Sequence, residues 1–211
     1  MKTIRPIFAT PAFACSLIFA GLSAVPGLRA EGETPTPAPV PAPVTPAPTT
    51  PTEATPEASK EYEAMIPIIK KHAELCSDAQ LKMDFDKVLP YVPKKLLETM
   101  GGAELLKTRL DQASTMLKSR GVTIDSAKIG TPQVPKNHGG VLVSLVPMET
   151  MMTTPQGKII ASSHMIAISE DKGASWVFVD TATVNEDKLG TLYPALKGKV
   201  DIPMATARKG E

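Results

Sequence analysis

The sequence predicts an α+β fold, with helices first and a hairpin-linked antiparallel sheet second. Three observations support this prediction. Between residues 59 and 121, apolar positions recur at helical spacing and are interrupted by proline and glycine. After residue 121 the period changes, and β-rich runs alternate with short turn signals. Finally, the eight residues "SEDKGASW" (169–176) fit the pattern S-x-D-x-G-x-T-W, with serine in the threonine position, which describes a β-hairpin.

The N-terminus has the order of a secretory signal peptide. Lys2 and Arg5 precede an apolar stretch with "ACSLIFAGLSAV" as its densest part, and small residues close it. We expect a signal peptide over 1–30 with cleavage after Ala30; cleavage after Ala24 and retention as an N-terminal anchor are the alternatives. The interrupted apolar stretch is shorter than the roughly 20 residues that span a bilayer. The sequence therefore predicts a secreted or periplasmic protein of the cell envelope, with no membrane span after signal cleavage.

Residues 31–58 form a Pro/Thr/Ala-rich segment in which proline recurs at about every second or third position. Such a segment buries too little apolar surface to fold, and its prolines favour an extended polyproline II conformation. We expect a disordered tether, followed by one domain over 59–211. Without residues 1–30 the chain has 20 basic and 22 acidic residues and no basic stripe, so no nucleic-acid partner is expected.

The first half of the domain predicts three helices. Ser59 is the expected N-cap of the first, and Pro67 should kink that helix or mark its true first turn. A short helix is expected from about Lys94 to Met100, after breaks at two prolines. A third, amphipathic helix should end at Gly121. The predicted buried positions of the first and third helices are Met65, Ile66, Ile69, Ala73 and Cys76, and Leu106, Leu110, Ala113 and Leu117.

The second half predicts strands in "VTIDSAKI", "GGVLVSLVPMETMM", "KIIASSHMIAIS" and "SWVFVDTA", with "TPQG" turning the chain between the second and third. A short closing helix should follow, with Thr183 and Glu186 as a capping box. Gly190 and Pro194 limit that helix to a couple of turns.

The pattern in "SEDKGASW" is the Asp-box of sialidases and related β-propellers. A propeller needs several such boxes and a longer chain, so we interpret Ser169, Asp171, Gly173 and Trp176 as hairpin construction without catalysis. Pairing Ser169 with Ser175 across a loop over 170–174 sets a register. The cross-strand pairs that this register predicts are Ile168–Trp176, Ile166–Phe178 and His164–Asp180.

The order of elements, the "SEDKGASWVFVD" hairpin and the closing "LGTLYPAL" segment resemble the NTF2-like (cystatin-like α+β cone) superfamily, in particular its uncharacterised exported bacterial members. The resemblance covers roughly residues 60–203. It implies a curved antiparallel sheet wrapped around the N-terminal helices, with a conical pocket on the concave face. Some members are isomerases, dehydratases or hydrolases, and many others are non-catalytic binding or dimerisation modules, so the fold does not choose between them.

The candidate site residues follow from this pocket. His164 and Asp180 are the candidate catalytic pair, because a carboxylate beside an imidazole fixes its tautomer and raises its basicity. A phenol could assist a developing oxyanion. The residues expected to bind a ligand are Tyr91, Trp176, Phe178 and Tyr193.

Other candidates have simpler interpretations. His72 should be solvated, His138 lies in a loop, and these scattered histidines do not predict a metal site. Asp84 and Asp86 suit helix caps better than metal ligands. Cys76, alone once the signal is removed, is expected to be a buried inert thiol. The cluster of Met148, Met151 and Met152 could bind Cu(I), but adaptable apolar packing is favoured.

The expected function is a non-catalytic binding or interaction module displayed on the Pro-rich tether. Its partner would be a small apolar or amphipathic ligand or another protein, and a homodimer is compatible with an open curved sheet. The alternative is a small isomerase or hydrolase that uses His164 and Asp180. No cofactor and no metal are expected.

Overall fold

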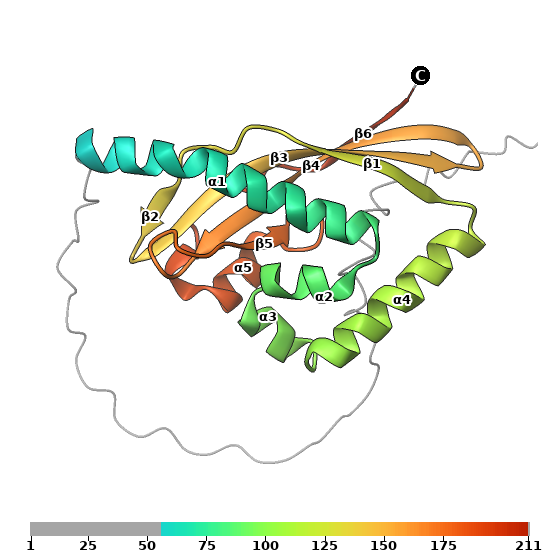
Figure 1. Cartoon of the computed structure of the whole chain (residues 1–211), viewed down its shortest axis with the longest axis horizontal. Helices are drawn as coiled ribbons and strands as arrows, with labels where there is room; N and C mark the ends of the chain where they lie inside the picture. The colour runs from blue at the N-terminus through green and yellow to red at the C-terminus, as the bar shows by residue number, and fades with distance from the viewer. Residues whose placement is uncertain (1–55, 211) are drawn as a thin grey trace, which may run out of the picture.

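The computed structural model describes residues 56–210, with side chains from Lys60 onward, and it has the predicted α+β architecture (Figure 1). The predicted signal peptide (1–30) and most of the predicted tether (31–58) lie outside the described residues. In chain order, the elements are α1 (Pro56–Leu81), α2 (Phe85–Val88), the 3-10 turn η2 (Leu89–Tyr91), α3 (Lys94–Thr99), α4 (Ala103–Ser119), β1 (Thr123–Ile129), β2 (Lys136–His138), β3 (Val141–Thr154), β4 (Gly157–Ser169), β5 (Val177–Asp180), α5 (Glu186–Leu192), the 3-10 turn η3 (Pro194–Leu196) and β6 (Thr206–Lys209).

Helix α1 is longer than predicted and is continuous. It begins at Pro56, so Ser59 lies inside the first turn and is not the N-cap, because the good helix formers Glu57 and Ala58 extend the helix toward the N-terminus. Pro67 also lies inside the helix and does not mark its start. Pro67 lies on the exposed side of the helix. Water can therefore donate a hydrogen bond to the carbonyl one turn earlier, which proline cannot reach because it has no N–H. Of the predicted apolar face, Ile69, Ala73 and Cys76 are buried, and Met65 and Ile66 are half-buried.

A glycine ends α4 as the sequence predicts, and Gly101 and Gly102 follow α3. After α4, the Gly121 N–H donates to the Lys118 carbonyl at 3.0 Å, and the Val122 N–H donates to the Leu117 carbonyl at 2.9 Å. These two bonds form a Schellman motif, which needs a left-handed residue at the position of Gly121, and its φ is +66°. The buried face of α4 contains the predicted residues Leu106, Leu110, Ala113 and Leu117.

The sheet has six antiparallel strands in the order β1–β3–β4–β5, with β2 added to β3 and β6 added to β4. Its centre is the long β3–β4 hairpin, which pairs from Leu142–Ser169 to Thr154–Gly157 across the predicted "TPQG" turn. The short strands β2 and β6 were not predicted. Neither has the alternating apolar residues that indicate a strand.

The sheet curls into a half-barrel whose two faces are covered by different helices (Figure 1). We call the face covered by α1 the concave face and the face covered by α5 and η3 the convex face. A buried core lies on each, and a third core joins the end of α1 to α2, η2, α3 and α4. Representative residues of the concave core are Ile69, Leu142, Met165, Trp176 and Phe178, and those of the convex core are Val143, Ile166, Val179, Leu189 and Leu196.

The closing helix α5 begins two positions later than the predicted capping box implies. Its N-cap is Asn185, whose side-chain oxygen accepts a hydrogen bond from the Lys188 N–H at 3.0 Å. Thr183 is not the cap, because its hydroxyl donates to the Asp180 carbonyl at 2.8 Å instead. Gly190 lies inside the helix, and Pro194 begins η3, so the helix is as short as expected.

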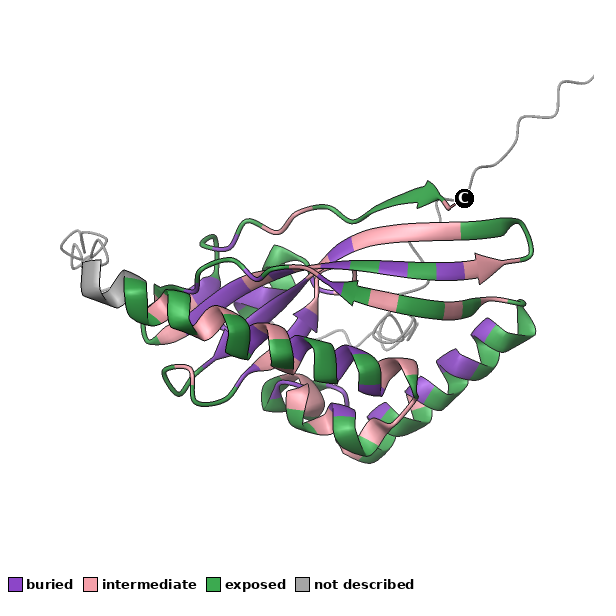
Figure 2. Ribbon diagram, turned by 45° about the horizontal axis from the view of Figure 1, so that its top comes forward, coloured by how far each residue is buried: buried purple, intermediate pink, exposed green. Residues whose placement is uncertain are grey.

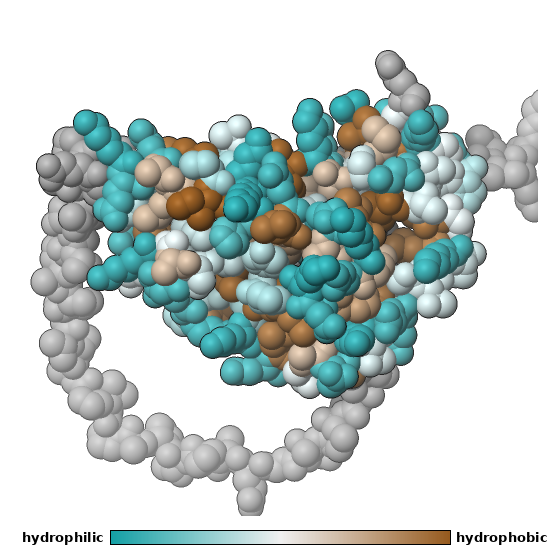
Figure 3. Space-filling view, in the orientation of Figure 1, coloured by the Kyte–Doolittle hydropathy of each residue, from teal (hydrophilic) through white to brown (hydrophobic). Residues whose placement is uncertain are grey.

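The outer surface mixes hydrophobic and charged side chains (Figure 3). The larger exposed apolar side chains on the helices include Ile68 and Leu75 on α1 and Leu105 and Met116 on α4. Within residues 56–210, no helix combines the length and the apolar character that a membrane crossing requires.

Candidate functional site

The Asp-box residues build the β4–β5 turn, as predicted. The Asp171 carboxylate accepts hydrogen bonds from the Ser169 hydroxyl at 2.7 Å, the Ser175 N–H at 2.9 Å and the Ser175 hydroxyl at 2.5 Å. These bonds, those to Ser175 first, lower the pKa of Asp171 to about 2. The Gly173 N–H donates to the Ser169 hydroxyl, and the φ of Gly173 is +94°, in the region that glycine favours. Trp176 is buried beneath the turn, so each motif residue has a structural task.

The predicted register across this turn is wrong by one residue. The Ser175 N–H is bonded to Asp171 and cannot join the ladder, so β5 begins at Val177. The first cross-strand pair is therefore Ile168–Val177. The pairs that follow are Ala167–Phe178, Ile166–Val179 and Met165–Asp180.

This shift separates the two candidate catalytic residues. Asp180 pairs with Met165, whose side chain belongs to the concave core, and it lies two residues after Phe178 of the same core. Side chains alternate along a strand, so Asp180 lies on the concave side. His164 alternates with Met165 and shares the convex side with Ile166. A slip of one residue has moved the predicted partners to opposite faces.

Asp180 occupies the end of β5, where the chain turns toward α5. Its Oδ1 atom accepts a hydrogen bond from the Ala182 N–H at 2.8 Å. Burial raises the pKa of Asp180 to about 6, and the Ala182 hydrogen bond opposes this shift only in part. Among the described residues, no lysine, arginine or histidine forms an ion pair with this carboxyl.

His164 is held by its backbone. Its N–H donates to the Thr181 hydroxyl at 3.2 Å, and its carbonyl accepts from the Thr181 N–H at 3.0 Å. The ring atom Nδ1 is buried and has no hydrogen-bond partner among the described residues. Burial lowers the pKa of His164, so the imidazole is neutral at pH 7. These features suit a packed strand residue on the convex side.

Three of the four predicted binding residues meet on the concave side. Trp176 and Phe178 are buried in the concave core, and Tyr91 packs against it. The rings of Tyr91 and Phe178 lie 5.9 Å apart, and Tyr91 also contacts the ring of His72 edge-on at 5.9 Å. Burial, followed by the nearby Cys76, raises the pKa of Tyr91. The sequence suggested that His72 is solvated. In the structure it packs against the ring of Tyr91 instead.

Tyr193 lies apart from these three residues. It is buried in the convex core, and the Lys95 ammonium lies 4.6 Å from the centre of its ring. Burial, followed by the charge of Glu170, raises the pKa of its phenol. Lys95 also forms an ion pair with Glu170 at 3.0 Å. Tyr193 thus helps to fasten α3 and the β4–β5 turn to the end of α5.

Two buried polar residues that the sequence analysis did not select accompany Asp180 on the concave face. Ser163 and Thr150 are buried, at 4% and 1% exposure. Ser163 pairs with Met148, and Thr150 pairs with the neighbouring Ala161. Thr150, Ser163 and Asp180 are therefore diagonal neighbours across β3, β4 and β5, at spacings of about 7–8 Å. We call these three residues the concave polar band. The correct register of β4 and β5 would have placed these three residues on one face in the sequence analysis.

The concave polar band has apolar neighbours on both sides. Met148, Met152 and Met165 are buried on the same face. Met151 alternates with them and is exposed on the other face, so the predicted methionine cluster is divided between two faces. The burial map shows this alternation along the outer half of the sheet (Figure 2). Within the described chain, no group of three or more His, Cys, Asp or Glu residues could hold a metal ion.

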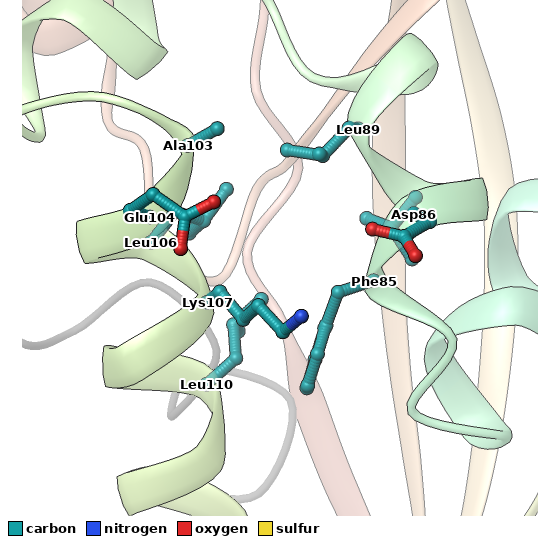
Figure 4. A pocket seen from close by; sticks show the side chains of 9 residues that line it. Phe85, Asp86, Leu89, Ala103, Glu104, Leu106, Lys107 and Leu110 are labelled. Carbon is teal, nitrogen blue, oxygen red and sulfur yellow. The ribbon is translucent and has the colours of Figure 1, made fainter.

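A small cavity lies between α2 and α4, away from the concave polar band (Figure 4). Its volume is about 20 Å³, room for about one water molecule. Phe85 and Leu89 line one side, and Leu106 and Leu110 line the other. Asp84 caps α2 through its hydrogen bond with the Lys87 N–H, as predicted for a helix cap. This cavity is a packing defect between helices and is too small for an organic ligand.

Comparison with known proteins adds no assignment: no family model, no curated protein and no solved structure matches this chain.

Proposed function

We propose that this protein is an exported binding module of the NTF2-like cone type, held on the Pro-rich tether over 31–58. Its ligand site is the concave face around the concave polar band. The α+β order and the curled antiparallel sheet support the cone type. The tether supports display of the domain at a distance from a surface.

The observation on which the proposal depends is the environment of Asp180. Asp180 is half-buried and forms no ion pair with a cation of the described residues, so its poorly solvated charged form destabilises the fold. Asparagine could accept the same hydrogen bond from the Ala182 N–H and would serve the turn equally well. A titratable group kept at such a position is a candidate for ligand binding.

The surroundings of Asp180 define the class of ligand. The carboxylate favours a cationic or hydrogen-bond-donating group, and the hydroxyl of Ser163 can orient a further polar atom. Met148 and Met165 offer adaptable apolar surface beside them. We therefore infer a small amphipathic ligand with an amine or another donor group at one end.

The isomerase or hydrolase alternative depended on a facing His164–Asp180 pair. The observed register places these residues on opposite faces, so that alternative loses its proton-transfer pair. Asp180 remains as a single carboxyl, which suits binding better than the predicted two-residue catalysis.

The test compares the mature chain with Asp180→Asn and with the matched control Asp201→Asn at an exposed position. Amphipathic amines and neutral alcohols of the same carbon skeleton are screened by thermal shift and titrated by calorimetry. The proposal expects an amine that binds the native chain and the control, and binds Asp180→Asn at least about tenfold more weakly, the scale of one charge-assisted hydrogen bond. Equal affinity for all three chains would contradict it.

Export and display have a separate test. Intact-mass measurement of the secreted protein should give an N-terminus at Glu31, or at Val25 if the alternative cleavage site is used. Retention of residues 1–24 would show an uncleaved anchor instead.

A further inference from the structure

The C-terminal strand β6 is the only strand of the described sheet whose residues are all exposed, although the short strand β2 also has no buried residue. All four of its residues are exposed, and it contributes no buried side chain (Figure 2). It pairs antiparallel with β4 through Ile159–Lys209, Ile160–Arg208, Ala161–Ala207 and Ser162–Thr206. Its attachment is therefore mainly a backbone ladder.

The direction of each backbone N–H in β6 follows from one bond. The Gly210 N–H donates to the Lys158 carbonyl at 2.9 Å, in the same register as the strand pairs. Hydrogen-bonded and non-hydrogen-bonded pairs alternate in an antiparallel ladder. The N–H groups of Arg208 and Thr206 therefore point toward β4, and that of Ala207 points to solvent.

Little else holds this strand. The Arg208 guanidinium lies 3.6 Å from the Glu149 carboxylate, and both side chains are at least half exposed, so the pair is weak. The preceding segment includes Met204, which is 89% exposed. The last apolar anchor before it is Ile202, which is half-buried and packs against the convex core beside the buried Val200. A strand with few buried contacts opens at low free-energy cost.

We propose that the edge of β4 over Ile159–Ser162 is a docking site for an extended peptide segment of a partner protein, and that β6 is a built-in occupant which leaves when the partner binds. An incoming strand would gain the same backbone bonds that β6 makes. This interaction surface is separate from the concave polar band and goes beyond the ligand binding proposed above.

The edge specifies the chemistry of the partner segment. A basic residue opposite Ile160 would reach Glu149, as Arg208 does. Ile159 is half-buried and pairs with Lys209, whose side chain is exposed. A β-branched apolar residue at that position would gain a cross-strand contact that β6 lacks. The favoured partner is thus an extended segment that combines a basic residue with an adjacent β-branched one.

A second copy of this chain is a weaker occupant. Exchange of C-terminal strands would reproduce the contacts of β6 without adding any. The resident strand also competes at an effective concentration on the millimolar scale. Only a segment with additional side-chain contacts has an advantage over β6.

The test uses the mature chain and its Arg208→Pro variant, which removes one ladder N–H and frees the edge in place. The probe is a fluorescein-labelled peptide of residues 202–211, followed by fluorescence anisotropy. The variant should bind the probe at least about tenfold more tightly than the native chain, because the resident strand no longer competes. A probe that carries Lys209→Val should bind more tightly still.

Backbone N-methylation of the probe provides a matched control. Methylation at Arg208 blocks a hydrogen bond to β4 and should weaken binding by about tenfold, the cost of a lost bond with its partner unpaired. A methyl group on the Ala207 nitrogen would face solvent and should leave the affinity unchanged. Equal loss from both methylated probes would overturn the proposed ladder.

Two further results would overturn the proposal. The first is a folded Arg208→Pro variant, shown by an unchanged near-ultraviolet signal of Trp176, that does not bind the probe at about 1 mM. The second is a native dimer that this substitution abolishes, because it would assign the edge to a second copy. If the variant fails to fold, a chain that ends at Ala205 replaces it.

Amide hydrogen exchange of the native chain gives an independent test. The N–H groups of Ile160 and Ser162 should exchange faster than that of Ala161, and equal protection of the three would show that β6 does not open.

Discussion

Asp180→Asn should stabilise the domain at neutral pH and leave its stability unchanged near pH 4. The substituted amide keeps an oxygen for the Ala182 N–H, so the turn at the end of β5 is conserved. What the substitution removes is the cost of charging a half-buried carboxyl.

The magnitude follows from the pKa. Burial raises the pKa of Asp180 from 3.8 to about 6, and each pKa unit corresponds to about 1.4 kcal/mol, so the native charge costs roughly 3 kcal/mol at most. The folded state holds this proton more tightly than the unfolded chain. Native stability therefore falls as pH rises from about 4 to about 6 and stays lower above that range. Asp180→Asn lacks this decrease.

Urea unfolding at pH 4 and pH 7.5, followed by the fluorescence of the only tryptophan, Trp176, measures both free energies. The native chain, Asp180→Asn and the exposed-site control Asp201→Asn are compared at each pH. The account predicts a gain for Asp180→Asn that appears at pH 7.5 alone. An equal effect at both pH values, or a loss of stability at pH 7.5, would refute the inference that this half-buried carboxyl has no cationic partner.

Three further results are expected. Asp171→Ala should destabilise the domain by about 1–2 kcal/mol through lost turn hydrogen bonds. Because the pKa of Asp171 is lowered to about 2, the destabilisation should disappear as pH falls from about 4 toward 2. A destabilisation that does not depend on pH would contradict this. Gly121→Ala should cost about 1–2 kcal/mol in urea unfolding, because φ is +66° and the new methyl would lie 3.2 Å from Pro155, and an unchanged midpoint would refute this geometry. Burial raises the pKa of the Cys76 thiol to about 12, so iodoacetamide should label it only after unfolding, as peptide mapping would show; rapid labelling of the folded domain would contradict its burial.

Local signals in the sequence predicted much of the fold. The apolar spacing of α4 and the glycine after it identified a helix and its end, because both features act within one or two turns. The hairpin turn between β3 and β4 and the Asp-box turn were also predicted, since their side chains bond nearby backbone groups.

The failures came from competition between neighbouring groups. Asp171 takes the Ser175 N–H, which delays β5 and shifts the register that joins Asp180 to β4. Asn185 caps α5 because the Thr183 hydroxyl is bonded to the Asp180 carbonyl. In each case two side chains could make a bond, and the folded chain selects one of them.

The candidate site was predicted only in part. The sequence selected Asp180, Tyr91 and Phe178, which the structure brings to the concave side. It missed Ser163 and Thr150, because a shift of one residue changes which side chains share a face. Strand β6 was missed for another reason: it is held by backbone bonds, which leave no pattern in the side chains.

The most direct test of the central claim is native mass spectrometry of the mature protein and of Asp180→Asn, produced and purified in the same way from the exporting cell. The account predicts a bound small molecule on the native chain, retained on Asp201→Asn and reduced or absent on Asp180→Asn. A native chain without any bound mass, or the same mass on both the native chain and Asp180→Asn, would contradict a ligand site at the concave polar band.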